Sequence, residues 1–219
     1  MINSAAVQIA PPLRLDALWR AAAYVGRLMA TFVVASLIVG LPVLVHHGVS
    51  TYVHPPRKLP VSTPARVGLA YSDVVLQTRD GLRLAAWSVP GPRPDALILI
   101  HGIGNNRDDL LPVARDLRAR GYNLLLLELR AHGQSEGDTS TLGVHEVEDV
   151  RAALNFLKQQ PGVDPRRIGV WGMSLGSSVA IMSAAALPEL RAVAADSVFA
   201  SARWLIALDA ARSFRSMPR

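Results

Sequence analysis

Residues Gly172-Met173-Ser174-Leu175-Gly176 decide how the rest of this sequence is interpreted. They form a G-x-S-x-G pentapeptide, which is typical of a serine on a sharp turn between a strand and a helix. The apolar stretch 168–171 predicts the strand, and the small-residue stretch 175–186 predicts the helix. Glycines on both sides allow the crowded backbone that such a turn needs. The motif therefore predicts a nucleophilic serine at the end of a strand.

Strand and helix signals alternate around this pentapeptide. Strands are expected at 73–78, 82–89, 96–100, 123–129, 167–171 and 191–195, and helices at 108–120, 144–159 and 175–186. Asp80-Gly81, between the first two strands, is typical of a tight hairpin turn. Apolar strands that alternate with helices indicate an α/β fold with a mostly parallel sheet. We expect an N-terminal hairpin and four parallel strands, the last of them at an unprotected edge.

An uncharged apolar run from Leu28 to Val45 precedes this region. It is long enough for a transmembrane helix, in which Gly40 and Pro42 are tolerated. A cleaved signal peptide is the alternative, with Gly48-Val49-Ser50 as a poor cleavage site. We expect four parts: a tail over 1–27, a transmembrane helix over 28–47, a Pro-rich extended linker over 48–66 and the α/β domain over 67–219.

Membrane orientation depends on the flanking basic residues. Arginines before the helix and basic residues after it nearly balance, so the positive-inside rule decides little. The free amino terminus and the closeness of Arg27 favour an inside N terminus. We therefore expect a single-pass membrane protein whose α/β domain faces the periplasm or the exterior.

Composition excludes several classes of function. The net charge is +6, from 23 basic and 17 acidic residues, and the basic residues are scattered. This indicates a solvated surface near an anionic membrane rather than a nucleic-acid site. The sequence has no cysteine, which excludes disulfides, zinc–thiolate sites and a cysteine nucleophile. With no metal-ligand spacing and no dinucleotide motif, we expect no cofactor, no metal and no nucleic-acid partner.

Two histidine-containing loops follow neighbouring predicted strands. His101-Gly102-Ile103-Gly104 follows strand 96–100, where a loop supplies the second backbone donor of an oxyanion hole. His132 lies in the loop 130–135, after strand 123–129. Each histidine has two interpretations, as a catalytic base or as a structural residue of its loop. The structural interpretation is favoured for both.

In this order and spacing, the motifs resemble the α/β-hydrolase superfamily from about Tyr71 to Phe199. They are most similar to bacterial membrane-anchored members related to serine aminopeptidases and monoacylglycerol lipases. The matching stretches are 99–107, 129–135, 142–146 with 149–150, and 167–176. The resemblance implies Ser174 as the nucleophile, and the N–H groups of Ile103 and Leu175 as the oxyanion donors.

The sequence departs from the pattern of this superfamily in three places. Glu128 stands where Asp is usual, and Ser177 where a second Gly is common. The larger departure concerns the acid and the histidine, which the superfamily places after the serine, whereas all six histidines here precede Ser174. We therefore expect an incomplete, C-terminally truncated α/β-hydrolase fold in which Asp196 is structural and no histidine reaches Ser174.

Two functions remain open. The first is a serine hydrolase for ester or amide bonds of a small-molecule, acyl or peptide substrate, crippled because the acid and histidine are missing. The second is a non-catalytic binding module of the same fold, tethered to the lipid bilayer. In both cases we expect poor stability, because the apolar tail residues Phe199, Trp204, Leu205, Ile206 and Leu208 would be exposed.

Overall fold

A computed structural model describes residues 15–199 and 201 of the chain. It divides into two compact units, Met1–His47 and Gly48–Arg219. Residues 204–208 of the apolar tail lie outside the described residues, so their predicted exposure stays a prediction. Phe199, which we expected to be exposed, is instead partly buried against the core of the second unit.

The first unit consists of a helical segment that is longer than expected. It comprises α1 (Leu15–Ala35), a π-helical turn (Ser36–Gly40) and α2 (Leu41–Val53), which continues into the second unit. The predicted bounds 28–47 are therefore too short at both ends. The π turn stands directly before Pro42, and the Leu41 N–H bonds Ser36 O. A wider turn removes the clash that a proline ring makes with the carbonyl four residues back.

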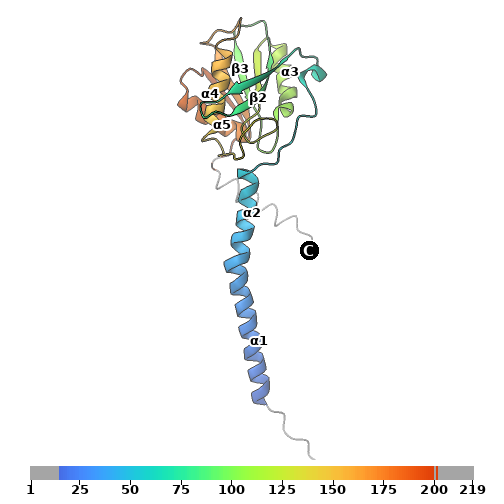
Figure 1. Cartoon of the computed structure of the whole chain (residues 1–219), viewed down its shortest axis with the longest axis vertical. Helices are drawn as coiled ribbons and strands as arrows, with labels where there is room; N and C mark the ends of the chain where they lie inside the picture. Colours follow the sequence, from blue (N-terminus) through green and yellow to red (C-terminus); the bar gives the residue numbers. More distant parts are fainter. Residues whose placement is uncertain (1–14, 200, 202–219) are drawn as a thin grey trace, which may run out of the picture. The chain divides into compact units, whose positions relative to one another are not determined.

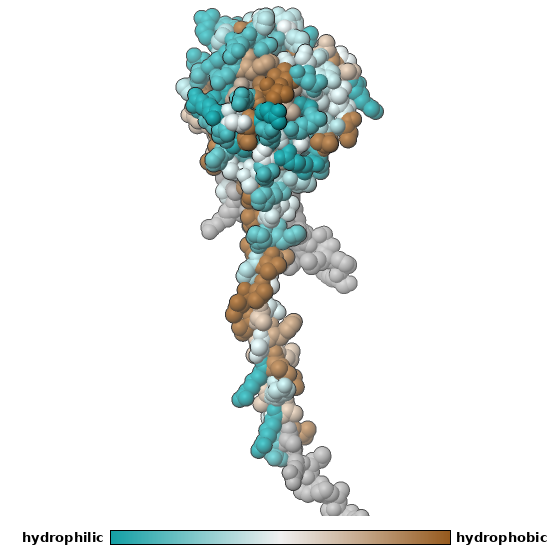
Figure 2. Space-filling view, viewed as in Figure 1, coloured by the Kyte–Doolittle hydropathy of each residue, from teal (hydrophilic) through white to brown (hydrophobic). Residues whose placement is uncertain are grey.

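This segment is the one described helix that is long and apolar enough to cross a membrane. Over Leu18–Val53 its most apolar window has a mean hydropathy of 2.5, and none of that window is buried. Figure 2 shows white and brown residues along most of the helix, with hydrophilic side chains near its start. A signal sequence near the N terminus meets the same criteria of length and composition.

The second unit is built around a six-stranded sheet with the order β1-β2-β4-β3-β5-β6. Its strands are β1 (Ser72–Gln77), β2 (Arg83–Val89), β3 (Ala96–Ile100), β4 (Asn123–Leu127), β5 (Ile168–Met173) and β6 (Ala192–Asp196). The first two strands form an antiparallel hairpin, and β3 to β6 run parallel to one another. The predicted mostly parallel sheet with an N-terminal hairpin is confirmed.

Helices cover both faces of this sheet (Figure 1). On one face α3 (Leu111–Ala119) packs with Trp87 and Leu99, and a short 3-10 helix (Arg107–Leu110) leads into it. On the other face α4 (Glu146–Leu157) and α5 (Leu175–Ala186) enclose the larger core, which includes the inward side chains of β3 and β4. The strand β6 lies at the edge of the sheet, and all five of its residues are exposed, as expected.

Residues 53–62, which we call the strap, correct the prediction of an extended linker over 48–66. The strap is bound to the loops that follow β3 and β4. Arg57 Nη1 donates to Ser135 O at 2.6 Å, and Asn106 Nδ2 donates to Lys58 O at 3.2 Å. Asp108 Oδ2 accepts the N–H groups of Val61 and Ser62, at 2.8 and 3.2 Å. The α/β unit therefore begins at Gly48 and includes the whole of the predicted linker.

Candidate active site

Ser174 is the single residue between β5 and α5, and it lies on the turn that the pentapeptide predicts. Its backbone has φ 54° and ψ −114°, a conformation that is rare for a residue with a side chain. Such backbone strain costs about 1–3 kcal/mol and clusters at functional sites. Ser174 as a whole is half-buried, at the carboxyl end of β5.

The two flanking glycines leave no room for a side chain. A Cβ atom on Gly172 would lie 1.9 Å from Gly176 O, and one on Gly176 would lie 2.4 Å from Ile100 O. Both obstacles are backbone atoms, which cannot move aside without breaking the sheet or the helix. The sequence pattern therefore reflects steric necessity at these two positions.

Asp196 fixes this turn through its backbone. Its carbonyl oxygen accepts the Ser174 N–H at 2.9 Å and the Ser177 hydroxyl at 2.5 Å. Its carboxylate accepts a hydrogen bond from the neighbouring Ser197 hydroxyl. This agrees with the structural role expected for Asp196, and it gives Ser177, where a glycine is common, a role in holding the turn.

The loop after β3 comes up against the serine. A Cβ atom on Gly102 would lie 3.3 Å from Ser174 Cβ and 3.8 Å from Ser174 Oγ, so the backbone of this loop lies close to the serine side chain. In this loop the Gly104 N–H is bound by His132 Nε2 at 3.1 Å, whereas the Ile103 N–H has no hydrogen-bond partner in the described part of the chain. Leu175 opens α5, and the first N–H groups of a helix lack intrahelical acceptors.

His101 and His132 are buried at the bases of the two loops. The His101 ring bonds Gly102 O through Nδ1 and accepts the Leu129 N–H at Nε2, at 2.8 and 3.2 Å. The His132 ring bonds Arg130 O through Nδ1 at 2.8 Å and Gly104 through Nε2. The ring centroids are 5.0 Å apart in an edge-to-face contact. Every ring nitrogen therefore has a backbone partner.

Burial keeps both rings neutral. Desolvation, and after it the repulsion that a protonated His132 would exert, lowers the pKa of His101 to about 3. Desolvation also lowers the pKa of His132. A general base needs a pKa near the working pH and a nitrogen aimed at the nucleophile. Neither ring has a nitrogen free for Ser174, because all four ring nitrogens bond backbone groups of the loops.

The loop after β4 is anchored by a buried ion pair that the sequence did not reveal. Arg130 Nη2 donates to Asp149 Oδ1 at 2.7 Å, and both side chains are almost fully buried. Arg130 Nη1 also donates to Asp80 at 2.8 Å. Burial alone would lower the pKa of Arg130, but these hydrogen bonds outweigh it and raise the pKa. Because the partners lie 19 and 50 positions away, no local pattern announces them.

Glu146 is the first residue of α4. It is fully buried and accepts hydrogen bonds from the Ser140 hydroxyl, from the Thr141 N–H and hydroxyl, and from the Gly143 N–H. Burial alone would raise the pKa of Glu146, but the hydrogen bonds outweigh it and lower the pKa. This carboxylate therefore organises the loop that leads into α4.

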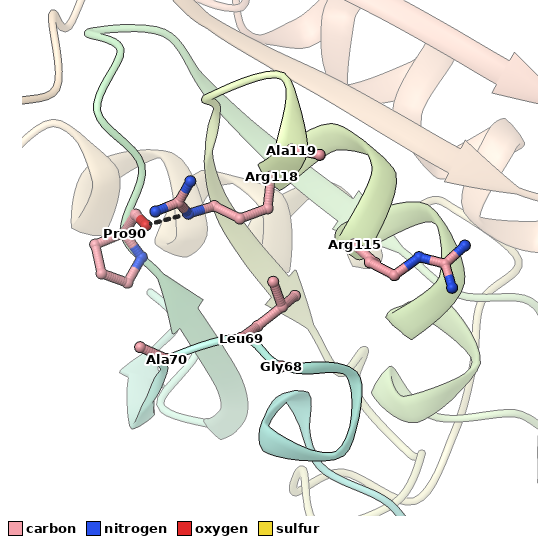
Figure 3. Close-up of a pocket in the computed structure, with 7 residues that line it drawn as sticks. All are labelled: Gly68, Leu69, Ala70, Pro90, Arg115, Arg118 and Ala119. Atoms are coloured by element: carbon pink, nitrogen blue, oxygen red, sulfur yellow. Dashed lines mark hydrogen bonds between the residues drawn. The ribbon is translucent and has the colours of Figure 1, made fainter.

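Two hollows of the second unit matter for locating a binding site. One, of about 440 Å³, is shown in Figure 3 and is lined by Gly68, Leu69, Ala70, Pro90, Arg115, Arg118 and Ala119. It lies at the amino ends of the parallel strands, the edge opposite Ser174, and Arg118 Nε is bound to Pro90 O. The other, of about 450 Å³, includes Ile103 and Gly104 in its lining. The second is adjacent to the candidate active site.

Comparison with known proteins agrees with this geometry. Residues 97–219 match the sequence profile of the Alpha/beta hydrolase family. The structure is similar to that of the esterase Pf2001 of Pyrococcus furiosus, with a TM-score of 0.67 and 32% sequence identity over 75% of this chain and 66% of that chain.

Two curated relatives have comparable identities. The chain is 34% identical over 155 residues to an uncharacterized protein of Mycobacterium tuberculosis, covering 66% of this chain and 54% of that protein. It is 36% identical over 121 residues to the thiohydrolase aneE of Aspergillus aculeatus, covering 52% of this chain and 37% of that protein. The chain thus spans about half the length, or less, of the curated relatives it matches.

Proposed function

The chain belongs to the alpha/beta hydrolase family, and we propose that it is a serine hydrolase acting on ester or amide bonds through Ser174. The observation that carries this proposal is the strained turn at Ser174, held in contact with Gly102 of the loop after β3. A backbone held in such a conformation brings the hydroxyl and two N–H groups to the same end of the sheet. This is the arrangement that acyl transfer requires.

The reaction would proceed in two steps. Ser174 Oγ attacks the carbonyl carbon of the substrate, and its proton passes to a base, while the N–H groups of Ile103 and Leu175 receive the negative charge on the carbonyl oxygen. Collapse of this intermediate expels the alcohol or amine and leaves an acyl-serine ester. Water then adds to that ester and releases the acid. The N-terminal end of α5 favours the developing negative charge.

The described residues do not supply the base that would accept the proton of Ser174 Oγ. His101 and His132 are tied to backbone groups through both ring nitrogens. We therefore propose that this chain by itself hydrolyses activated esters barely above background. Losing members of a catalytic triad lowers turnover by about a millionfold in serine proteases. The engaged histidines also favour the second candidate, a binding module that holds substrate-like molecules without turnover.

Chemical rescue separates the two candidates. A fluorophosphonate probe would be added to the full chain in detergent micelles, with and without imidazole as an external base. For a hydrolase, labelling of the Ser174 peptide is slow and rises several-fold with imidazole. No labelling in either condition supports the binding module.

Two variants control this experiment. Ser174→Ala should abolish the labelling, whereas Ser178→Ala, on the same helix, should keep it. Stoichiometric labelling without imidazole that is lost in His101→Ala or His132→Ala would show that one of these rings acts as the base, contrary to the proposal.

We also propose that the apolar helix anchors the chain in a membrane, with the α/β domain in the periplasm or outside the cell. The length and hydropathy of Leu18–Val53 support an anchor. Alkaline carbonate extraction should leave the intact chain in the membrane fraction. Release of a soluble chain shortened near Gly48 would support the signal-peptide alternative instead. Protease accessibility of the domain in intact cells tests the orientation.

A further inference from the structure

The strap forms one wall of the cleft beside the predicted oxyanion loop. This cleft, of about 450 Å³, is lined by Gly48, Thr51, Tyr52, Pro56, Lys58, Ile103 and Gly104. Its volume lies in the range of small-molecule sites. The strap and the loop are close, since a Cβ atom on Gly104 would lie 3.7 Å from the ring of Pro56. A substrate with its carbonyl oxygen at the Ile103 N–H would therefore have this cleft beside it.

Several hydrogen bonds fix the wall of the cleft in place. Arg57 donates to the carbonyl oxygens of Gly133, Ser135 and Gly137. Behind it, Ser140 N donates to Val53 O at 2.8 Å. These bonds join the strap to the loop after β4, the loop that carries His132. A wall held at several points can select among ligands, because it does not change its shape to fit every ligand.

The lining is apolar on one side and carries one cation. The rings of Tyr52 and Pro56 and the side chain of Ile103 supply the apolar surface. Lys58 is exposed and makes no ion pair in the part of the chain that the structure describes. The nearby Asp108 carboxylate already accepts hydrogen bonds from the N–H groups of the strap. Burial raises the pKa of the Asp109 carboxyl, and the positive charge of Lys58 opposes this rise.

We propose that this cleft binds the part of an ester that adjoins the scissile carbonyl, and that Lys58 selects esters carrying a carboxylate or another anion there. The proposal rests on the proposed hydrolase function and names its substrate class. An ammonium group at the mouth of an apolar cleft attracts an anion on a short apolar stem. The exposure of Lys58 limits the preference to about 3- to 10-fold, because exposed ion pairs are weak.

Lys58 and Lys158 are the only lysines of the sequence, which provides an internal control. Lys158 pairs with Glu189 and lies against another part of the surface. The full chain in micelles would be treated with an amine-acetylating reagent, and the modification of each lysine followed by peptide mass spectrometry. Monoethyl glutarate, an anionic ester, should slow the acetylation of Lys58 at least 3-fold and leave Lys158 unchanged. Ethyl pentanoate, which has a methyl group in place of the carboxylate, should protect neither.

Calorimetric titration with the same two esters tests the selection directly. Lys58→Met should weaken binding of monoethyl glutarate about 3- to 10-fold, whereas the matched Lys158→Met should not change it. Equal protection of both lysines, or an unchanged affinity in Lys58→Met, would overturn the proposal. An adventitious surface attraction would appear as a loss of similar size in both variants, and it would also overturn the proposal.

The outcome can be separated from that of the proposed function. Ser174→Ala should bind monoethyl glutarate as the parent chain does, since the cleft does not include this hydroxyl. If Ser174 never reacts with a phosphonate but the ester still protects Lys58, the hydrolase proposal fails and the anion-selective cleft remains. If Ser174 reacts and Lys58 is not protected, only the cleft fails.

Discussion

The turn at Ser174 and the histidine loops beside it are built in different ways. The turn is fixed sterically, because its two glycines leave room for neighbouring backbone atoms. A Cβ atom added to Gly172 would lie only 1.9 Å from such an atom. The loops are fixed chemically, by imidazole nitrogens and by a buried ion pair that bond backbone groups. The comparison teaches that a serine and two histidines at one end of a sheet do not make a dyad. Each group is available for catalysis only if the fold does not already use it.

The largest expected effect comes from breaking the steric side of this comparison. In Gly172→Ala the added Cβ meets Gly176 O, a backbone atom, so the turn cannot form as it stands. We expect a loss of more than about 4 kcal/mol in the free energy of unfolding, enough to leave the domain largely unfolded. Urea denaturation followed by circular dichroism measures it. Gly26→Ala, where nothing lies within 4 Å, should show no loss.

The histidine loops should lose stability when the buried ion pair loses one partner. Arg130→Met leaves the Asp149 carboxylate buried without its cation, which we expect to cost about 3–5 kcal/mol. Adding Asp149→Leu should restore part of this loss, because the unpaired charge is then gone. Arg83→Met removes an exposed pair with Glu136 and should cost far less, because water screens exposed charges. Equal losses in Arg130→Met and Arg83→Met would contradict the buried anchor.

A pH titration sharpens the comparison, because Ser174 and its flanking glycines have no titratable side chain, whereas the loop after β3 carries the buried His101. The unfolded chain binds a proton at His101 below about pH 6.5, whereas the folded ring stays neutral down to about pH 3. Stability should therefore fall as pH falls through this window, by up to about 1.4 kcal/mol per pH unit from this group. His101→Asn, which keeps a donor for Gly102 O, should flatten the slope. A slope in His101→Asn equal to that of the parent chain would refute the assignment.

The smallest effect concerns the strain at Ser174. A glycine adopts φ 54° without the Cβ clash, so Ser174→Gly should stabilise the fold by about 1 kcal/mol after the greater chain entropy of glycine is subtracted. Ser174→Ala keeps the Cβ and should show no such gain. Thermal unfolding of the two variants side by side measures the difference, and a Ser174→Gly variant that melts below Ser174→Ala would mean that the turn is not strained.

Local patterns predicted most of the fold and the serine. Strand 96–100 matches β3 at both ends, and the Asp80-Gly81 hairpin and the turn at Ser174 lie where expected. These features depend on neighbouring residues, whose apolar alternation and glycines are visible in the sequence. The catalytic roles of Ser174, Ile103 and Leu175 themselves remain proposals.

Long-range bonds account for what the sequence did not reveal. The strap has no apolar periodicity, and its prolines predict an extended linker, but Arg57 binds carbonyl groups 76 to 80 positions away. Two other features were also invisible in the local sequence pattern. They are the buried ion pair of Arg130 with Asp149 and the hydrogen bonds that Glu146 accepts from the loop before α4. The predicted helix over 28–47 already ran through Pro42, and the helical segment extends past it at both ends, to Leu15 and to Val53.

The carbonyl of Asp196 has a consequence for the order in which the protein is made. Ser174 N and Ser177 Oγ both depend on this oxygen, which belongs to the last strand of the sheet. A ribosome that adds about 5–20 residues per second delivers residue 196 about one to four seconds after residue 174. During that interval the nascent chain contains Ser174, but the residue whose carbonyl oxygen accepts its backbone N–H has not yet been added. The complete set of hydrogen bonds around the Ser174 turn therefore forms only after β6 has been made and has paired with β5.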